Sequence, residues 1–335
     1  MKTLVTGGLG FIGAALVRAL VASGEAVRVF DNSSRGSIEK LGDAASDVEI
    51  ITGDIRDPAL VRKAVQGMQR VVHLAYVNGT EYFYKHPAYV LDVGIKGMVN
   101  VIDSCIQEGV KDFIVASSSE VYQMPPSIPT PENVPLSVPD PLNPRYSYGG
   151  GKILTELMAL NYGRDYFDRV VIFRPHNVYG PAMGYEHVIP QCIDRMQKLS
   201  QKHPGHTIQF PIQGSGNQTR SFIYIADFTD GLVQTINAGT HMGIYHIGTT
   251  DEIRIADVVE KIAAEMHLSI SIQPEPEMAG GTSRRCPDIT KIQSLGFAPR
   301  YSLAQGLKPT IEWYLQHPAP PRADVTNIPA LFFHS

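Results

Sequence analysis

The sequence predicts an α/β protein with a doubly wound parallel sheet, followed by a smaller C-terminal α/β region. Two observations in the first half predict this fold class. Short runs rich in β-branched residues alternate with longer segments of helical periodicity, and a glycine-rich turn follows the first run. Such alternation is typical of parallel strands joined by crossover helices that cover both faces of the sheet.

The predicted strands cover residues 3–6, 26–31, 48–52, 70–74, 111–117 and 169–174. Between the first two strands, Ile12, Leu16 and Leu20 recur at helical spacing, which predicts a crossover helix. Prolines crowd residues 124–144 and exclude helix or central strand, so we expect a long ordered loop or lid there. Helical patterns return at residues 146–162 and near 189–200.

These patterns predict a division of the chain into two regions and a tail. Residues 1–176 are expected to form the sheet domain, which also receives about residues 221–248. Residues 177–220 and 249–317 are expected to form the smaller region. The tail, residues 318–335, is rich in Pro and Ala and has no periodicity that places it.

Composition excludes several classes of protein. Of 335 residues, 43% are hydrophobic, which suits one large domain or two closely packed ones. The net charge is −4 and no basic stripe is present, which argues against a nucleic-acid partner. Cys105, Cys192 and Cys286 lack metal-ligand spacing, so we expect no metal site and reduced thiols in a cytoplasmic protein. No apolar run approaches the roughly 20 residues that span a membrane.

The glycine-rich turn predicts a dinucleotide site of the Rossmann type. Gly7, Gly10 and Gly13 stand between the first strand and the first helix, where residues without Cβ allow a tight turn and a close approach to pyrophosphate. Phe11 and Ile12, in the same turn, are expected to contact the cofactor as well. An isolated motif of this kind is also found in plain loops, but its position between strand and helix favours the dinucleotide.

Asp31 ends the second strand, where an acidic residue accepts hydrogen bonds from the adenosine ribose. An anion there repels a 2′-phosphate, so NAD is predicted rather than NADP. Asp31 could instead cap a turn with Asn32 and Ser33, and nearby Arg35 keeps NADP open. Further cofactor contacts are expected at the ends of the second, third and fourth strands, from Asn32, Asp54, Ile55, Leu74 and Ala75.

Tyr148 and Lys152 lie four residues apart, on one face of a predicted helix. A nearby ammonium stabilises a phenolate, so the pair suits proton transfer beside a nicotinamide, although a Tyr and a Lys can share a helix face by chance. Ser118 follows the fifth strand, where open α/β sheets place ligands. The glycines at 149–151 each cost about 1 kcal/mol relative to Ala in a helix, so we expect the backbone there to approach another group, the cofactor being our expectation.

These residues resemble the extended short-chain dehydrogenase/reductase superfamily, specifically its nucleotide-sugar epimerases, dehydratases and decarboxylases. The resemblance extends to about Tyr314. The segment Arg174-Pro175-His176-Asn177 is similar to the one that leads into the family's substrate domain, and the segments around Arg220 and Arg285 are similar to those whose arginines grip the nucleotide diphosphate. As bare arginines they would be surface charges.

The resemblance implies a nucleotide-diphosphate sugar as substrate and makes the smaller region its binding region. The residues that it places on this substrate are Ser119, Asn177, Val188, Arg220 and Arg285. It also implies a homodimer, formed through the helix that carries Tyr148 and a neighbouring helix. One departure from the family lies at Asp92-Val93-Gly94, where the superfamily often has an Asn that supports the helix and a water relay.

The resemblance implies that Tyr148 takes the proton of a sugar hydroxyl while Ser118 hydrogen-bonds the reacting oxygen, which gives a 4-keto sugar. We expect a 4-epimerase. The motif Ser118-Ser119-Glu120 instead resembles dehydratases and decarboxylases, so a 4,6-dehydratase or an NDP-uronate decarboxylase with Glu120 as acid or base is the alternative. Glu120 could also merely bind a hydroxyl or cap a turn. A catalytically silent NAD-binding regulatory protein is the alternative from another class.

Overall fold

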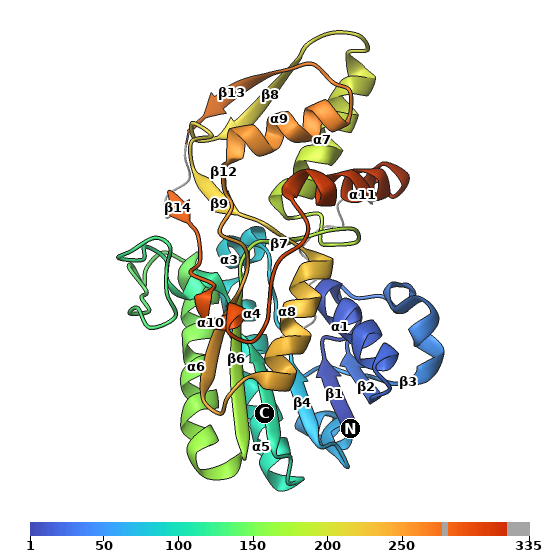
Figure 1. The fold of residues 1–335 in the computed structure, drawn as a ribbon, viewed down its shortest axis with the longest axis vertical. Coiled ribbons are helices and arrows are strands. Elements are labelled where there is room, and N and C mark those ends of the chain that lie inside the picture. Colours follow the sequence, from blue (N-terminus) through green and yellow to red (C-terminus); the bar gives the residue numbers. More distant parts are fainter. Residues whose placement is uncertain (277–280, 320–335) are drawn as a thin grey trace.

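The computed structural model describes residues 1–276 and 281–319. A larger body holds a parallel sheet with its helices, and a smaller body of helices and short strands stands on the carboxyl edge of that sheet (Figure 1). The predicted tail, residues 318–335, lies outside the described residues from residue 320 onward.

The large sheet has seven strands in the order β11-β6-β5-β4-β1-β2-β3, and every neighbouring pair is parallel. This confirms the predicted doubly wound parallel sheet. The strands are β1 (Lys2–Thr6), β2 (Ala26–Asp31), β3 (Val48–Thr52), β4 (Arg70–His73), β5 (Asp112–Ala116), β6 (Arg169–Pro175) and β11 (Gly243–Ile247). The first six match the predicted strands to within a residue at each end. The seventh, β11, was not predicted and extends the sheet beyond β6.

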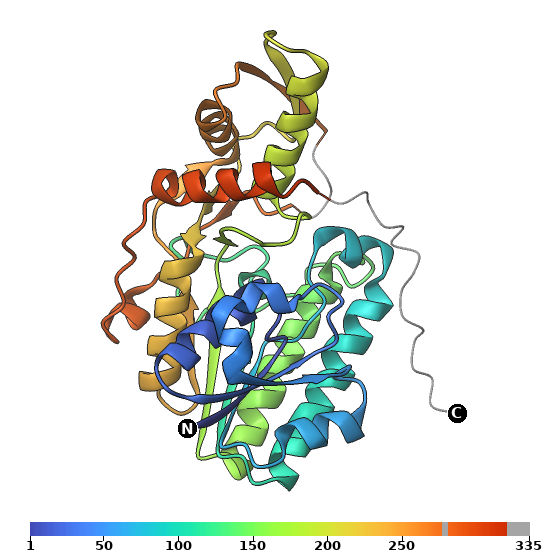
Figure 2. The same cartoon turned by 90° about the vertical axis from the view of Figure 1, so that its right-hand side faces the viewer.

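Helices cover both faces of the sheet, and each face has its own apolar core (Figure 2). On one face lie α1 (Phe11–Ala22) and α8 (Ile225–Ala238). On the other lie α2 (Pro58–Val65), α5 (Gly97–Gln107) and α6 (Tyr146–Tyr166). Shorter helical segments connect these, namely η1 (Ile38–Asp47), α3 (Thr80–Lys85), α4 (Pro87–Leu91), the π-helical turn η2 (Asp92–Lys96) and η3 (Ser119–Val121).

The smaller body has a third apolar core. Its helices α7 (Val188–Lys202), α9 (Ile255–Glu265) and α11 (Leu303–Gln316) pack with the paired strands β8 (Ile208–Gln213) and β13 (Ile270–Glu275). Short strands join the two bodies, and a small helix follows them: β7 (Val178–Tyr179), β9 (Thr219–Ser221), β10 (Ile223–Tyr224), β12 (Glu252–Arg254), β14 (Arg284–Arg285) and α10 (Thr290–Gln293).

The proline-rich segment after η3 forms the long loop that its composition predicts. Residues 122–145 contain no helix or strand. The loop is nevertheless anchored, because the backbone of Thr130 exchanges hydrogen bonds with Cys286 and Asp288 at 2.9 and 2.8 Å. No helix among the described residues is long and apolar enough to cross a membrane.

Candidate active site

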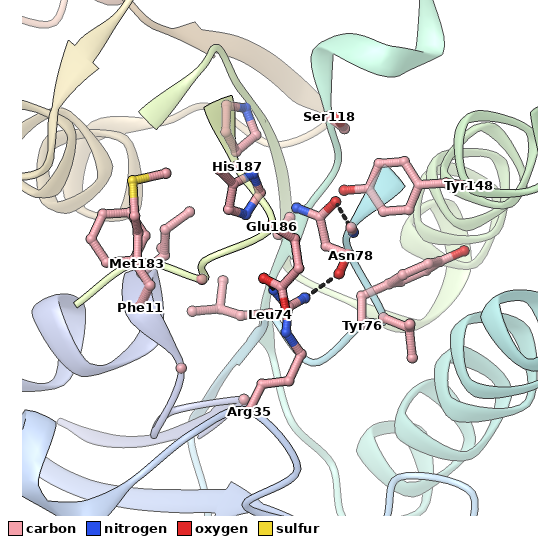
Figure 3. A pocket seen from close by; sticks show the side chains of 18 of the residues that line it. Phe11, Arg35, Leu74, Tyr76, Asn78, Ser118, Tyr148, Met183, Glu186 and His187 are labelled. Atoms are coloured by element: carbon pink, nitrogen blue, oxygen red, sulfur yellow. Dashed lines mark hydrogen bonds and ion pairs between the residues drawn. The ribbon is translucent and has the colours of Figure 1, made fainter. Parts of the chain in front are cut away.

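A cavity of about 870 Å³ opens at the carboxyl edge of the sheet, under the smaller body (Figure 3). The chain order reverses at β1, which lies between β2 and β4, and open α/β sheets bind ligands at such a switch point. Nearly all of the predicted site residues line this cavity: Gly7, Gly10, Phe11, Ile12, Gly13, Asp31, Asn32, Ile55, Leu74, Ala75, Ser118, Ser119, Glu120, Tyr148, Lys152, Asn177, Val188, Arg220 and Arg285.

The glycine-rich turn has the shape of a dinucleotide cradle. Gly7 adopts a φ of 72°, and a Cβ on it would lie 2.8 Å from the backbone nitrogen of Ala75. A Cβ on Gly13 would come under 3.0 Å from the carbonyl oxygen of Gly7, so only glycine lets α1 begin this close to β1. The free N-terminus of α1 then faces the cavity, where it suits a pyrophosphate. The residues present therefore fit NAD.

Asp31 ties the turn to the end of β2. Its carboxylate accepts hydrogen bonds from the backbone N–H of Leu9 at 3.0 Å and of Ser33 at 2.8 Å. The side chain therefore caps the turn and also lines the cavity, so capping does not exclude the predicted contact with a ribose. Asn32, next along the chain, lines the cavity beside it.

Asp54 is the one predicted site residue that the structure does not bring into the cavity lining. Its carboxylate accepts hydrogen bonds from the guanidinium of Arg56 at 3.0 and 2.8 Å, and Arg56 also pairs with Asp92. A buried arginine between two carboxylates is a structural ion pair, so Asp54 holds the β3 loop in place instead of lining the site. Gly53 and Ile55, its neighbours, do line the cavity.

Tyr148 and Lys152 occupy one face of α6 and are almost completely buried. Burial raises the pKa of Tyr148 to about 12, and a hydrogen bond with Ser118 acts in the opposite direction. Burial also lowers the pKa of Lys152 to about 7, against the negative charge of Glu156. The ammonium donates a hydrogen bond to the carbonyl of Ala116 at 2.7 Å, which fixes it at the end of β5. The hydroxyl of Tyr148 points into the cavity (Figure 3).

The glycine run of α6 serves protein contacts, which corrects our expectation that it approaches the cofactor. A Cβ at position 149 would come under 3.0 Å from the side-chain nitrogen of Gln123 and the carbonyl oxygen of Glu120. At position 151 it would come equally close to the hydroxyl of Tyr76. The run therefore lets η3 and Tyr76 pack directly on the helix that carries Tyr148.

Glu120 lies within a group of arginines. Its carboxylate accepts a hydrogen bond from Arg285 at 2.8 Å and lies 3.6 Å from Arg145. Burial alone would raise the pKa of Glu120, but the charges of Arg285 and Arg145, the hydrogen bond from Arg285 and the charge of Arg220 together hold it below its ordinary value. Glu120 is therefore a carboxylate at neutral pH.

Arg220 and Arg285 come from distant segments and meet in the fold. They stand opposite each other in the parallel pair β9–β14, and both line the cavity. Arg220 donates hydrogen bonds to the carbonyls of Thr219 and Thr282, each at 2.7 Å, so its guanidinium is held in one orientation. Burial and the charge of Arg285 lower the pKa of Arg220 to about 10. The arrangement concentrates positive charge on the side of the cavity where the substrate is expected.

Asn177 and Val188 complete the predicted substrate side. Asn177 has a φ of 42° and donates a hydrogen bond from its side chain to the carbonyl of Ser221 at 2.8 Å. Val188 begins α7 at the cavity wall.

Sequence reasoning missed several lining or neighbouring groups. Arg145 follows the proline-rich loop, and only the fold brings it to Glu120. Arg35, considered only as a possible phosphate ligand, instead pairs with Glu186 at 2.9 Å and donates to the carbonyl of Asn78 across the cavity (Figure 3). Tyr76 was also missed, although its position just after the fourth predicted strand marked it as a cavity residue. No group of metal-ligating side chains exists among residues 1–276 and 281–319.

Known proteins similar in sequence to this chain include enzymes of nucleotide sugars. UDP-glucuronic acid decarboxylase 1 of Arabidopsis thaliana is 30% identical over 92% of this chain and 68% of its own length. A putative UDP-glucose 4-epimerase of Methanocaldococcus jannaschii is also 30% identical, over 92% of this chain and 97% of its own.

Solved structures give the same picture. The UDP-glucose 4-epimerase of Thermotoga maritima, solved with UDP-glucose, superposes with a TM-score of 0.82 at 27% identity, covering 95% of this chain and 99% of its own. A dTDP-glucose 4,6-dehydratase variant of Streptomyces venezuelae, solved with NAD bound, gives a TM-score of 0.84 at 27% identity, covering 94% and 97%.

The sequence model of the NAD dependent epimerase/dehydratase family matches residues 3–248, which is most of the chain. The family contains 4-epimerases, dehydratases and decarboxylases of nucleotide sugars, and its cofactor is NAD. With a glycine cradle and a buried Tyr-Lys pair facing a group of arginines, this chain belongs to the NAD-dependent epimerase/dehydratase family.

Proposed function

We propose that this protein is an NDP-sugar 4-epimerase that works through a transient 4-keto sugar. The observation that carries the proposal is the state of Glu120, which Arg285 and Arg145 hold as a carboxylate at the substrate side of the cavity. An acid held in this way suits binding, because it positions the arginines, and does not suit proton donation.

Tyr148 and Ser118 handle the proton and the reacting oxygen. The phenol of Tyr148 points into the cavity, where it takes the proton of the sugar C4 hydroxyl, and the hydroxyl of Ser118 hydrogen-bonds that oxygen. Lys152 supplies a positive charge close to the phenol, which stabilises the phenolate. The turn of Gly7, Gly10 and Gly13 would hold NAD⁺, which would supply a reversible hydride acceptor for C4. Once hydride has returned to the opposite face of C4 in the rotated keto sugar, Tyr148 gives the proton back to the oxygen at C4.

A dehydratase needs an acid that gives a proton to the departing hydroxyl and a base that takes one from C5. Glu120 is the residue that the Ser118-Ser119-Glu120 motif offers for this role, and its pKa lies below the ordinary value because of its arginine partners. The proton is therefore absent at neutral pH, and the lowered pKa also makes the carboxylate a weak base. This argument favours the epimerase over the dehydratase.

A uronate decarboxylase is the second candidate, because a separate observation favours it. Arg145, Arg220 and Arg285 outnumber Glu120, the carboxylate among them, and a sugar C6 carboxylate can pair with an arginine of this group as a phosphate oxygen can. A 4-keto uronate loses carbon dioxide without any proton being taken from C5. The decarboxylase relative from Arabidopsis supports this candidate.

Mass spectrometry of the products distinguishes these reactions. The purified protein is incubated, without added cofactor, with UDP-, GDP-, CDP- and dTDP-sugars, including uronic acids. We expect an unchanged mass with a new chromatographic peak. Loss of carbon dioxide would establish the decarboxylase, and loss of water would overturn our assignment of Glu120. A protein that binds NAD and turns over none of these sugars would be a regulatory binding protein.

A Glu120→Gln variant tests the role of the carboxylate directly. If Glu120 only positions Arg285, the variant keeps the same product and kcat falls less than about tenfold, because an amide oxygen still accepts a hydrogen bond from the guanidinium. A loss of about 10³-fold would identify Glu120 as an acid or base and favour a lyase.

A homodimer is also part of the proposal. Apolar side chains that are 37–51% exposed follow one another along α6, with two more on α4 and α5: Leu154, Leu157, Tyr162, Tyr166, Leu91 and Val99. Pairing of these helices with those of a second copy would bury this stripe. Light scattering of Leu157→Glu should give a monomer, whereas Met124→Glu, at an apolar residue 73% exposed in the proline-rich loop, should remain dimeric.

A further inference from the structure

Tyr76 lies just beyond β4, directly against the Tyr148–Lys152 pair. The Nζ of Lys152 lies 3.9 Å from the centre of the Tyr76 ring, nearer than the 5.9 Å to the ring of Tyr148. The rings of Tyr76 and Tyr148 meet edge to face at 5.4 Å, and Phe83 stacks on Tyr148 at 4.6 Å. An ammonium within about 6 Å of an aromatic face is attracted to it, and the attraction grows when water is excluded.

Two glycines make room for this ring. A Cβ on Gly94, in η2, would come under 3.0 Å from both the hydroxyl oxygen and the Cζ of Tyr76. A Cβ on Gly151, in α6, would come under 3.0 Å from the hydroxyl oxygen only, with Cζ at 3.6 Å. Both glycines have ordinary helical backbones, where alanine is otherwise the better residue. The fold therefore accepts a helix-weakening residue at two places in order to seat one phenol.

The hydroxyl of Tyr76 does not explain this arrangement. It is buried, has no hydrogen-bond partner among the described residues, and points away from the cavity (Figure 3). The ring, in contrast, covers the ammonium. Four ionisable groups surround that ammonium: His73 at the end of β4, Tyr76 just after it, and Tyr148 and Glu156 on α6.

We propose that Tyr76 is a positioning residue, whose ring holds the charged ammonium of Lys152 next to Tyr148. Gly94 and Gly151 form the socket that seats this ring. The catalytic part of this inference rests on the proposed function, in which the cation of Lys152 stabilises the phenolate of Tyr148. The contact itself does not depend on which sugar reacts.

Nuclear magnetic resonance of the NAD-loaded protein tests the contact without any turnover. Lysine labelled with carbon-13 at Cε is titrated, and the Lys152 signal is identified by its loss in Lys152→Met. We expect Tyr76→Phe, which keeps the ring, to titrate as the parent does. Tyr76→Leu should lower the pKa of Lys152 by roughly one unit, a tenfold change in its ionisation constant. Identical titrations of the Phe and Leu variants would overturn the proposal.

Kinetics test the catalytic consequence on whichever NDP-sugar the parent converts. For Tyr76→Leu we expect kcat to fall about tenfold at neutral pH and the rising limb of its pH profile to move upward, with KM nearly unchanged. Tyr76→Phe should keep the parental profile. A parent that converts no sugar would refute the proposed function while the titration still tests the contact. An active parent with an unchanged Leu variant would refute only the positioning role.

Double variants test the socket, because a change in Tyr76 should rescue a substitution at one glycine and not at the other. Gly151→Ala should lower the melting temperature and kcat, and adding Tyr76→Phe should restore both, because the clash involves only the hydroxyl oxygen. Gly94→Ala is the matched control, since its Cβ would also meet Cζ, and Tyr76→Phe should not rescue it. Rescue of both glycine variants, or of neither, would contradict the socket.

Discussion

At the two ends of the cavity, around Tyr148 and around Glu120, burial has opposite outcomes for the ionisable side chains: it determines the pKa shift at the first end and is overcome by neighbouring charges at the second. Around Tyr148 and Lys152 most neighbours are aromatic rings and backbone. Burial outweighs the opposing effects of Ser118 and Glu156, so the pKa of the phenol is raised and that of the ammonium is lowered. Around Glu120 the neighbours are arginines, and their charges overcome burial, so the pKa of the carboxyl falls.

This difference separates proton transfer from binding. The pKa of a group without a fixed ion-pair partner responds to charges that arrive with the substrate or cofactor, which suits proton transfer. A group held by counter-charges stays ionised and keeps its partners in place, which suits a binding site for anions. We therefore expect the same cavity to contain a reactive end, around Tyr148, and a binding end, around Glu120, and the following changes test that division.

The largest expected effect comes from the reactive end. Tyr148→Phe removes the proton acceptor and keeps the ring that packs on Phe83 and Tyr76, so kcat should fall about 10³-fold while binding of NAD and of the NDP-sugar is preserved. Steady-state rates and calorimetric binding measure the two effects. Retention of a tenth of the parental rate would remove Tyr148 from its role.

The binding end should respond in KM instead. Arg285→Met removes a charged hydrogen-bond donor from the cavity and leaves Glu120 with Arg145 as its ion-pair partner, so KM for the NDP-sugar should rise about 30-fold with little change in kcat. Arg284→Met, one residue earlier and paired with Glu252 at the surface, should leave KM unchanged. A main effect on kcat would mean that Arg285 acts in the chemistry.

The last prediction concerns stability instead of activity, and its signal is a gradual change with pH. The pKa of Lys152 is about 7 in the folded protein, whereas an exposed lysine, as in the unfolded chain, has a pKa of 10.5. Between pH 7 and 10.5 the unfolded chain therefore binds more protons than the folded protein. Stability should therefore rise with pH in this window by up to about 1.4 kcal/mol per unit, and the penalty for burying the lysine is complete below pH 7.

Lys152→Met should lack that rise, so its stability advantage over the parent shrinks as pH increases from 7 to 10. Urea unfolding at several pH values measures the slopes. Lys111→Met, at an exposed lysine, is the control and should follow the parent. Parallel curves for Lys152→Met and the parent would show that Lys152 titrates normally in the folded protein.

The strands, the main helices and the cofactor turn were predictable because their signals are local. Alternating apolar runs, helical spacing and the glycines at 7, 10 and 13 report directly on backbone conformation. The strand β11 was missed because its short run, Gly243–Ile247, becomes a strand only by pairing with β6. The glycine run of α6 was recognised as a close approach but assigned to the wrong partner, since nothing local reveals that Tyr76 packs there.

By itself, the sequence determined the fold class, the dinucleotide cradle and the residue types of the site. Only the tertiary structure decided which of those residues meet. Glu120, Arg145, Arg220 and Arg285 are far apart along the chain, and their shared charge balance exists only once β9, β14 and η3 are packed together. The same holds for Asp54, which Arg56 holds outside the cavity. Ionisation depends on distance and burial, which are properties of the folded chain and cannot be read from spacing.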